Sequence, residues 1–218
     1  MSLKIKYKTL AILLLLVYGC QQEVMQDCIY KFSEDINTAI EERGEKPGQE
    51  LFNYATEFSF VPDVDRMKST RNLVGLNRPQ LDYRALFEEN EQIPAVDYIL
   101  NESQNHTILI LNESHYSPTH RRFAVSLLQG LYENGYRCLG VETLRNIDEC
   151  YHMEYPTLKS GYYTDEPTFA NFLRTAIDIG FTIFPYEGIN ITDGKQREID
   201  QANNIAEFIE KNKDDKVF

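Results

Sequence analysis

The stretch Thr107-Ile-Leu-Ile-Leu-Asn-Glu-Ser-His-Tyr-Ser-Pro-Thr-His-Arg-Arg-Phe123 decides the expected fold. Its apolar run from Ile108 to Leu111 is typical of a strand that is buried on both faces. Ser117-Pro118 then indicates a helix start, with a capping serine and proline at the first helical position. A strand, a polar turn and a capped helix make the first half of a βαβ unit. Glu113 and His115 occupy that turn, which is where open parallel sheets bind ligands.

The alternation of helix and strand continues along the chain. We expect helices from Pro118 to about Asn134, from Pro167 to Gly180 and over about 195–211, and strands over 136–141 and 181–186. Lys216-Val217-Phe218 resembles the start of a fourth strand, so the domain is expected to be incomplete. This pattern predicts an α/β fold with a parallel (βα) sheet, right-handed crossovers and helices on both faces.

The residues before 105 are expected to form a tether and a mainly helical cover over residues 20–104. Helical spacing of apolar residues is found in 29–40, 80–89 and 94–101. The last two segments are typical of helices that cover a sheet. Residues 41–50 indicate a loop, and the aromatic-rich segment 52–61 fits either a short strand or an irregular cover.

The N-terminus has the features of a bacterial lipoprotein signal. Three lysines precede an apolar run over residues 10–18, which is too short to cross a bilayer as a lone helix. Val17-Tyr18-Gly19-Cys20 resembles a lipobox, in which the cysteine becomes the lipidated first residue. We therefore predict a signal peptide over 1–19, lipidation of Cys20 and an anchor in a membrane of the bacterial cell envelope, on its periplasmic or surface face. An ordinary signal peptide or an uncleaved anchor is the alternative.

Composition limits the expected partners. Of the 218 residues, 42% are hydrophobic and 12% aromatic, which is enough for one substantial α/β domain. The net charge of −12 argues against a nucleic-acid partner, because such surfaces need clustered lysine and arginine. The chain has no GxGxxG, Walker or GxSxG motif, so nucleotide binding and serine hydrolysis are not supported. A small-molecule substrate or ligand is therefore expected.

Carboxylates follow three consecutive strands of the expected sheet. Glu113, Glu142 and Glu187 each come at or just after a strand end, and His115 lies close to the first of them. Because the carboxyl ends of parallel strands share one edge of a sheet, these side chains are expected to converge. Clustered carboxylates repel one another unless a cation or a shared proton offsets the charge. We therefore predict that these four residues hold a divalent metal (Mn, Co or Zn), or that one carboxyl stays protonated.

Several other side chains are candidates for the same pocket. His120 is expected to be a further ligand or a substrate contact, although a histidine in a first helical turn often only caps the helix or faces solvent. Arg121, Arg197 and Tyr186 are expected to contact the substrate, and Arg121 alternatively pairs with the acids. The tyrosine-rich loop over 151–163 fits either an aromatic lid or ordinary packing.

Two segments together carry a resemblance to a known group. Residues 111–121, followed by Gly-Tyr-Arg-Cys-Leu-Gly-Val-Glu over 135–142, resemble the superfamily that unites erythromycin esterase-like proteins with the ChaN/Tiki haem-uptake and protease-like proteins. Its pattern is a strand ending in Gly-Glu-x-His, a helix, and a strand ending in Glu. Residues 197–205 also resemble a helix of that group. Asn112 stands where the group usually has glycine, and its second histidine would follow a further strand.

The resemblance, which covers residues 105–218, implies catalytic roles for Glu113, His115 and Glu142 and leaves three functions open. The first is a lipoprotein hydrolase of ester or amide bonds, with His115 as general base or with a metal that activates water. The second is a non-enzymatic lipoprotein that binds haem, with tyrosine or histidine as axial ligand, or another small ligand. The third is a structural cell-surface protein whose pocket has lost its function.

Overall fold

The computed structural model describes residues 32–43, 49–61, 63–73, 83–144, 152–188 and 194–218. Residues 33–218 form one compact unit. The predicted signal peptide and the lipidation site Cys20 lie outside the described residues. Within the part of the chain that the structure describes, no helix has the length and apolar character needed to cross a membrane.

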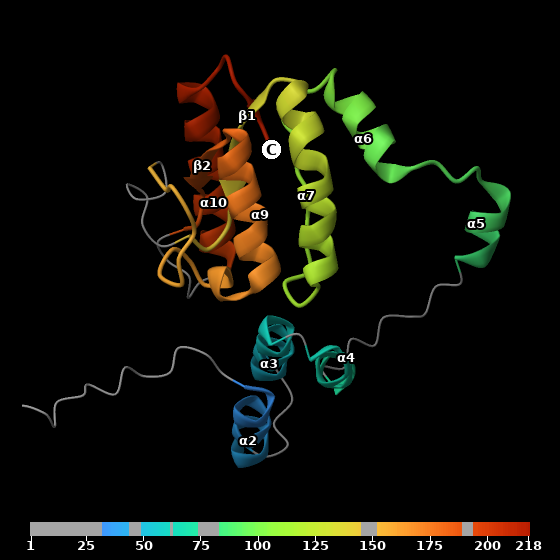
Figure 1. Ribbon diagram of the computed structural model, residues 1–218, viewed down its shortest axis with the longest axis vertical. Coiled ribbons are helices and arrows are strands. Elements are labelled where there is room, and N and C mark those ends of the chain that lie inside the picture. Colours follow the sequence, from blue (N-terminus) through green and yellow to red (C-terminus); the bar gives the residue numbers. More distant parts are fainter. Residues whose placement is uncertain (1–31, 44–48, 62, 74–82, 145–151, 189–193) are drawn as a thin grey trace, which may run out of the picture. The chain divides into compact units, whose positions relative to one another are not determined.

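Helices dominate the sequence before the sheet. They are α2 (Ser33–Arg43), α3 (Gln49–Phe60), α4 (Val64–Leu73), α5 (Arg84–Glu89) and α6 (Ala95–Ser103). The elements that follow are α7 (Pro118–Glu133), β1 (Tyr136–Val141), the short 3-10 helix η1 (Tyr163–Asp165), α9 (Pro167–Ile179), β2 (Thr182–Pro185), α10 (Gly194–Lys211) and β3 (Lys216–Val217) (Figure 1).

The three strands form a parallel sheet in the order β2-β1-β3. Leu139 is paired with Ile183 across β1 and β2, and Cys138 is paired with Val217 across β1 and β3. The predicted α/β class and the parallel pairing are therefore confirmed. The strand expected over 136–141 has the predicted bounds, and those expected over 181–186 and 216–218 are slightly shorter. The chain forms a small parallel sheet of three strands.

The segment 107–111 is not the strand buried on both faces that we predicted. It makes one isolated parallel bridge, Ile108 to Val217, supported by hydrogen bonds from Leu109 N–H to Val217 O and from Val217 N–H to Thr107 O, both 2.9 Å. The side chain of Ile110 is 74% exposed. The prediction is wrong because β3 offers only two residues for pairing, so the ladder is not sustained and the apolar side chains stay open to solvent.

Helix α3 also corrects a prediction, because residues 52–61 form neither a strand nor an irregular cover. Tyr54, Ala55 and Phe58 lie on one helical face and are buried, and Tyr54 and Phe58 pack in one cluster with Ile36 of α2. This spacing of i, i+1 and i+4 is helical, whereas the aromatic residues taken alone mimic an alternating pattern. Tertiary burial of the aromatic face decides for the helix.

The two helices expected to cover the sheet behave differently. Helix α5 has no buried residues, and Leu86 and Phe87 are both more than half exposed, so its predicted covering role is wrong. Helix α6 packs its apolar residues Val96, Ile99 and Leu100 against the main core, as predicted. The difference follows from length, because six residues make less than two helical turns and present no continuous apolar stripe.

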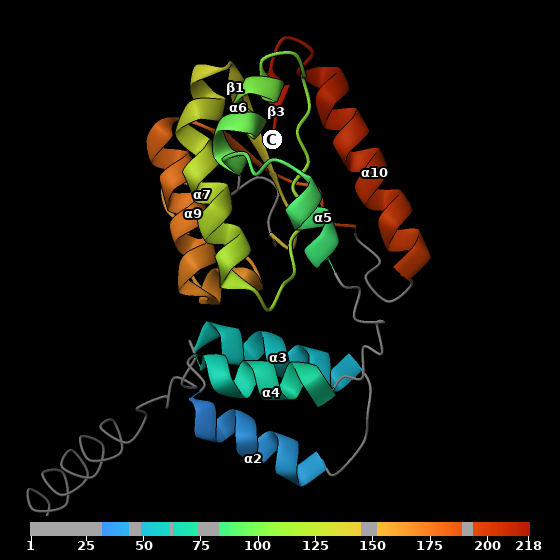
Figure 2. The ribbon, with the colours of Figure 1, turned by 90° about the vertical axis from the view of Figure 1, so that its right-hand side faces the viewer.

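The main core lies between α7, α9 and the sheet. Helices α7 and α9 run side by side in both views (Figures 1 and 2). They bury leucines and aromatic residues against β1 and β2, including Leu127, Leu131, Leu173, Leu139 and Ile183. Burial of each such side chain contributes about 1.5–3 kcal/mol, so this layer holds the strand ends in place.

A second, smaller cluster attaches α10 to the sheet. The ring of Phe208 stacks on Phe184 of β2 with centroids 3.7 Å apart and the planes 3° from parallel. Cys138 and Val217 complete the cluster. This contact fixes the rotation of α10, whose polar residues then face the carboxyl ends of β1 and β2.

The segment that leads to Glu113 is anchored at its start. Asn134, at the end of α7, donates a hydrogen bond to Ser103 Oγ at 2.9 Å, and the Tyr136 hydroxyl donates to the carbonyl of His106 at 3.0 Å. Lys216 Nζ donates to the carbonyl of Ser103 at 3.1 Å. Helix α6 is thereby tied to α7, β1 and β3, and the chain enters segment 107–111 at a defined place.

Candidate functional site

The predicted carboxylates lie at one edge of the sheet. Glu142 directly follows β1, Glu187 lies two residues after β2, and Glu113 lies two residues after segment 107–111, which makes the bridge to β3. His115 lies within 4 Å of both Glu113 and Glu142. Glu187 does not reach His115 directly and is instead joined to Glu142 through Arg197.

The first half of the site is the Arg121 cluster, formed by Glu113, Arg121 and Glu166. Arg121 Nε lies 3.1 and 3.0 Å from the two carboxylate oxygens of Glu113, and Nη2 donates to Oε1 at 2.7 Å. Its Nη1 donates to Glu166 Oε2 at 3.0 Å. Glu166 also accepts hydrogen bonds at 2.7 Å from the backbone N–H groups of Thr168 and Phe169, so it caps α9.

Two of the three side chains in the Arg121 cluster are almost completely buried. The side chain of Arg121 is 1% exposed and that of Glu166 is 2% exposed. Burial raises the pKa of Glu113, but hydrogen bonds with His115 and Arg121 outweigh it and hold the pKa below its usual value. Burial likewise lowers the pKa of Arg121, and its two glutamate partners reverse that shift and raise it. Glu113 and Arg121 therefore stay charged, and each of these two charges depends on its partners.

Aromatic rings complete the enclosure of Arg121. Its guanidinium carbon lies 4.9 Å from the ring centroid of Tyr163 and 5.1 Å from that of Phe169. Nη2 also donates to the carbonyl of His115 at 3.2 Å. These contacts lock the guanidinium in place, so Glu113 is held by a rigid partner.

The second half of the site is the Arg197 cluster, formed by Glu142, Glu187, Arg197 and Gln201. Arg197 donates through Nε and Nη2 to the two oxygens of Glu187, at 2.9 and 2.8 Å, and its Nη2 also pairs with Glu142 Oε1. Gln201 Nε2 donates to Glu187 Oε1 at 3.0 Å and to Glu142 Oε1 at 3.3 Å. Both donors come from α10, one helical turn apart.

This second cluster is more open to solvent. The side chains of Arg197, Glu142 and Glu187 are 29%, 22% and 15% exposed. Burial raises the pKa of Glu187, but hydrogen bonds from Arg197 and from the Gly188 N–H lower it below its usual value. Hydrogen bonding to Glu187 is the main cause that raises the pKa of Arg197. Glu187 and Arg197 are therefore charged and yet within reach of solvent.

His115 lies between the two clusters. Its Nδ1 is 3.5 Å from Glu113 Oε1, and its Nε2 is 3.8 Å from Glu142 Oε2. The imidazole stacks on the ring of Tyr163 with centroids 4.9 Å apart and an angle of 23°. The ring orientation is thus set by a carboxylate on one side and an aromatic face beneath it.

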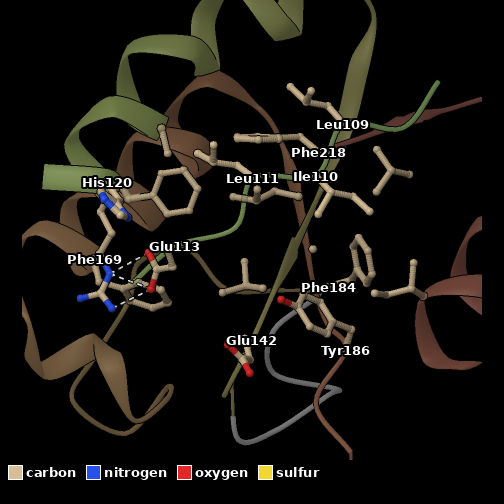
Figure 3. A pocket seen from close by; sticks show the side chains of 18 of the residues that line it. Leu109, Ile110, Leu111, Glu113, His120, Glu142, Phe169, Phe184, Tyr186 and Phe218 are labelled. Carbon is tan, nitrogen blue, oxygen red and sulfur yellow. Dashed lines mark hydrogen bonds and ion pairs between the residues drawn. The ribbon is translucent and has the colours of Figure 1, made fainter. Parts of the chain in front are cut away.

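A cavity of about 150 Å³ is lined by Glu113 and Glu142, the two carboxylates that lie near His115. Glu113 and Glu142 lie toward one end of it, and Leu109, Ile110 and Phe218 lie toward the other (Figure 3). Burial raises the pKa of Tyr186 in the wall, followed in effect by the nearby Glu142 carboxylate, so the phenol stays protonated. The cavity therefore combines an apolar half with a carboxylate-rich end.

The remaining predicted site residues take distinct places. His120 is exposed at the rim of the cavity, and its Nδ1 accepts a hydrogen bond from the Ser114 N–H at 3.0 Å. Arg121 lies almost wholly buried among protein partners, whereas Arg197 and Tyr186 are partly accessible. Their predicted roles as substrate contacts stay predictions.

Three functional neighbours were missed from the sequence. Glu166 immediately precedes Pro167 at the start of α9, and this placement at an N-cap was the available signal. Gln201 lies four residues after Arg197 in α10, so helical spacing alone indicates that both share one face. Tyr163 was noted only as part of a tyrosine-rich loop, and nothing local to it indicates stacking on His115.

Arginine side chains pair with the carboxylates in this arrangement and offset part of their charge. Both oxygens of Glu113 accept hydrogen bonds from Arg121, and both oxygens of Glu187 accept from Arg197. Among the described residues, no group of three or more His, Cys, Asp or Glu side chains is arranged to hold a metal ion. As placed, these side chains do not fit a metal site, and the expected Mn, Co or Zn stays a prediction.

No protein family, curated protein or solved structure was found that matches the chain. The likeness of residues 105–218 to the erythromycin esterase-like and ChaN/Tiki superfamily is therefore a prediction from the residues themselves. Function has to be inferred from the geometry at the carboxyl edge of the sheet.

Proposed function

We propose that this protein is a hydrolase of ester or amide bonds in which His115 is the general base. The observation that carries the proposal is the position of the imidazole, with Nδ1 3.5 Å from the Glu113 carboxylate and the ring stacked on Tyr163. A carboxylate that accepts a hydrogen bond from Nδ1–H favours the tautomer in which Nε2 is free to take up a proton. Arg121 holds that carboxylate in place, so it is a positioning residue.

The reaction step follows from the gap between His115 and Glu142. Nε2 and Glu142 Oε2 are 3.8 Å apart, and a water about 2.8 Å from each atom fits between them. The water gives one proton to Nε2 while its oxygen attacks the carbonyl carbon, which forms a tetrahedral intermediate. The imidazolium then returns the proton to the leaving oxygen or nitrogen as the acyl bond breaks. Arg197 supplies a cation for the oxyanion.

The proposal extends to the fold and the location. The small parallel sheet is consistent with part of a larger (βα) sheet with helices on both faces, as in the superfamily that residues 105–218 resemble. Lipidation at Cys20 would place this hydrolase at a membrane surface of the bacterial envelope. A small-molecule ester or amide is the proposed substrate class.

Two alternatives rank below this proposal. Haem binding is supported by the histidine and tyrosines beside the cavity, but about 150 Å³ matches a benzene-sized group rather than a macrocycle. A metal-assisted hydrolase is supported by charge, because Glu113, Glu142, Glu166 and Glu187 carry four negative charges against two positive charges on Arg121 and Arg197, a formal excess of −2.

Hydrolysis of a panel of nitrophenyl esters and anilides tests the proposal. We expect the His115→Gln variant to lose about 10²–10⁴-fold in kcat, since this is the usual contribution of a general base. His152→Gln, at an exposed histidine away from the site, is the matched control and should keep full activity. Full turnover by His115→Gln would refute the proposal, and metal content with and without a chelator separates the metal-assisted route. A Soret band on haem titration without turnover would support the binding alternative.

A further inference from the structure

The turn that follows β1 holds a residue in a conformation that its type rarely adopts. Thr143 comes directly after Glu142 and has a φ of 62°, and among the described residues no other residue apart from glycine has a positive φ. A β-branched side chain is strained in this left-handed region, because its Cβ lies too close to the backbone. Strain of this kind persists only where the surrounding structure holds the backbone in place, and it is found mainly at functional sites.

The hydroxyl of Thr143 does not account for this conformation. Its Oγ1 is buried and has no hydrogen-bond partner in the part of the chain that the structure describes. Asparagine and aspartate offset the cost of the left-handed region with a local hydrogen bond from their side chains, and Thr143 makes no such bond. The contacts that hold the turn are therefore made by its backbone.

Gly161 and Tyr162 hold the backbone of this turn. The Tyr162 N–H donates to Thr143 O at 3.3 Å, and Leu144 is paired with Gly161 in an isolated antiparallel bridge. A side chain does not fit between them, because a Cβ on Gly161 would lie 2.8 Å from Thr143 O and 3.3 Å from Leu144 Cα. We call these four residues, Thr143, Leu144, Gly161 and Tyr162, the turn clamp.

Thr164 fixes the turn clamp from the other side. Its hydroxyl accepts a hydrogen bond from the Gly161 N–H at 3.1 Å and donates one to Gly161 O at 2.7 Å. Thr164 is buried, so Gly161 cannot move away from the turn without leaving a polar group unpaired in the interior. The strained turn after β1 therefore contacts a backbone that is itself held in place.

The turn clamp lies between the two groups that the attacking water is proposed to contact. On one side, Glu142 is bonded to Thr143, and its Oε2 lies 3.8 Å from His115 Nε2. On the other side, Tyr163 directly follows Tyr162, and its ring stacks on the imidazole of His115. The hydrogen bond from Tyr162 to Thr143 therefore links the backbone next to Glu142 with the backbone next to the ring that supports His115.

We propose, on the basis of the proposed hydrolase activity, that the turn clamp sets the gap between His115 and Glu142. Thr143 and Gly161 are then positioning residues for the attacking water. A water bonds to both groups only while each lies about 2.5–3.2 Å from its oxygen. A change of Thr143 to a negative φ would redirect the chain next to Glu142 and move the carboxylate out of this range. The contacts of Gly161 prevent that change.

Gly161→Ala tests the turn clamp directly, because the added Cβ pushes Thr143 O away. We expect kcat for nitrophenyl esters to fall by about 10²-fold, since a shift of about 1 Å in a reacting group has this effect. KM should stay unchanged, because the contacts with the substrate stay in place. Gly194→Ala is the matched control, since its added Cβ meets no described atom within 4 Å, and it should keep full activity.

Two substitutions of Thr143 separate the role of its backbone from that of its side chain. Thr143→Pro fixes φ at about −65° and should lose activity as Gly161→Ala does. Asparagine tolerates the left-handed region, so Thr143→Asn should keep the kcat that the proline variant loses. The midpoint of urea unfolding should also rise for Thr143→Asn, because the strain is relieved.

The NMR resonance of the His115 Cε1–H group gives a readout that does not depend on turnover. It responds to the ring current of Tyr163 and to the charge of Glu142. The resonance should therefore move in Gly161→Ala and stay in place in Gly194→Ala.

An unchanged kcat or an unmoved His115 resonance in a folded Gly161→Ala chain would overturn the role of the turn clamp, even where His115→Gln supports the hydrolase. Without turnover in the unmodified chain the hydrolase proposal fails, and the resonance alone decides for or against the turn clamp. If Gly161→Ala does not fold, the Thr143 variants decide. Equal kcat values for Thr143→Pro and Thr143→Asn, or a shifted His115 resonance in Thr143→Asn, would then overturn the role of the turn clamp.

Discussion

The two arginine clusters of the site have the same chemistry and opposite settings. In each, one guanidinium holds two glutamates that come from different parts of the chain. Arg121 is 1% exposed and is enclosed by Tyr163 and Phe169, whereas Arg197 is 29% exposed and lies on α10. The Arg121 cluster is therefore the rigid, buried part of the site, and the Arg197 cluster is the part that solvent can reach.

The difference in burial changes how much free energy the loss of each ion pair costs the folded chain. A buried charge that loses its partner is left uncompensated in a medium that solvates it poorly, whereas a partly exposed charge is rescued by water. The Arg121 cluster should therefore act mainly on stability and on the orientation of His115. The Arg197 cluster should act mainly on what happens at the cavity.

The largest expected effect is that of Arg121→Met. Removing the guanidinium leaves Glu113 and Glu166 without their cation, and we expect a loss of about 3–5 kcal/mol in the free energy of unfolding. Urea denaturation followed by circular dichroism measures it. Arg174→Met, which removes an exposed pair with Asp178, is the matched control and should cost less than about 1 kcal/mol. Equal losses for the two variants would contradict the assignment of a structural role to Arg121.

Glu166→Gln should have an intermediate effect. The amide keeps one oxygen that can cap α9 but loses the charge that faces Arg121 Nη1, so we expect a loss of about 1–3 kcal/mol. The same urea titration measures it, with the exposed Glu88→Gln as control. A variant as stable as the original chain would show that Glu113 alone suffices to hold Arg121.

Arg197→Met should destabilise the fold by about 1 kcal/mol or less, because the side chain is partly solvated. Its larger consequence is expected in the hydrolysis assay, where loss of the cation beside Glu142 should lower kcat by about 10²-fold. A matched Lys211→Met change removes an exposed pair on the same helix and should alter neither quantity. Loss of stability comparable with that of Arg121→Met would erase the distinction between the clusters.

The smallest expected effect is on the decrease in the free energy of unfolding as the pH falls below 7. The pKa of Glu113 is lowered in the folded chain from the ordinary value of 4.5, so its contribution is present above that value and is lost as the pH falls through the folded-state pKa. The free energy of unfolding, measured from pH 7 to pH 3, should therefore fall less steeply for Glu113→Gln than for the unmodified chain. Identical slopes would mean that the Glu113 carboxylate gains nothing from His115 and Arg121.

Local pattern was sufficient for much of the sheet and for the convergence of the acids. Gly135 and Gly180 have φ values of 94° and 114°, and each lies at the turn between a helix and the strand that follows. Glycine adopts this conformation readily, which is why the ends of α7 and α9 could be placed from sequence. Once strands 136–141 and 182–185 run parallel, Glu142 and Glu187 necessarily share one edge.

Other features depended on contacts between distant residues. Ile108 to Leu111 has the composition of a buried strand, yet its exposure is decided by how many residues of β3 lie beside it. The pairing of Arg121 with Glu166 spans 45 residues, and that of Arg197 with Glu142 spans 55. No local periodicity reports which arginine meets which glutamate.

The sequence by itself thus determined the alternation of helices and strands, the turn glycines and the identity of the carboxylates at the strand ends, because these follow from short-range sterics and hydrophobic spacing. Only the tertiary structure decided that arginines pair with those carboxylates, that Arg121 is buried while Arg197 is partly exposed, and that His115 lies between the two clusters. Burial and partner distance set the energy of a charge, and both are properties of the assembled fold.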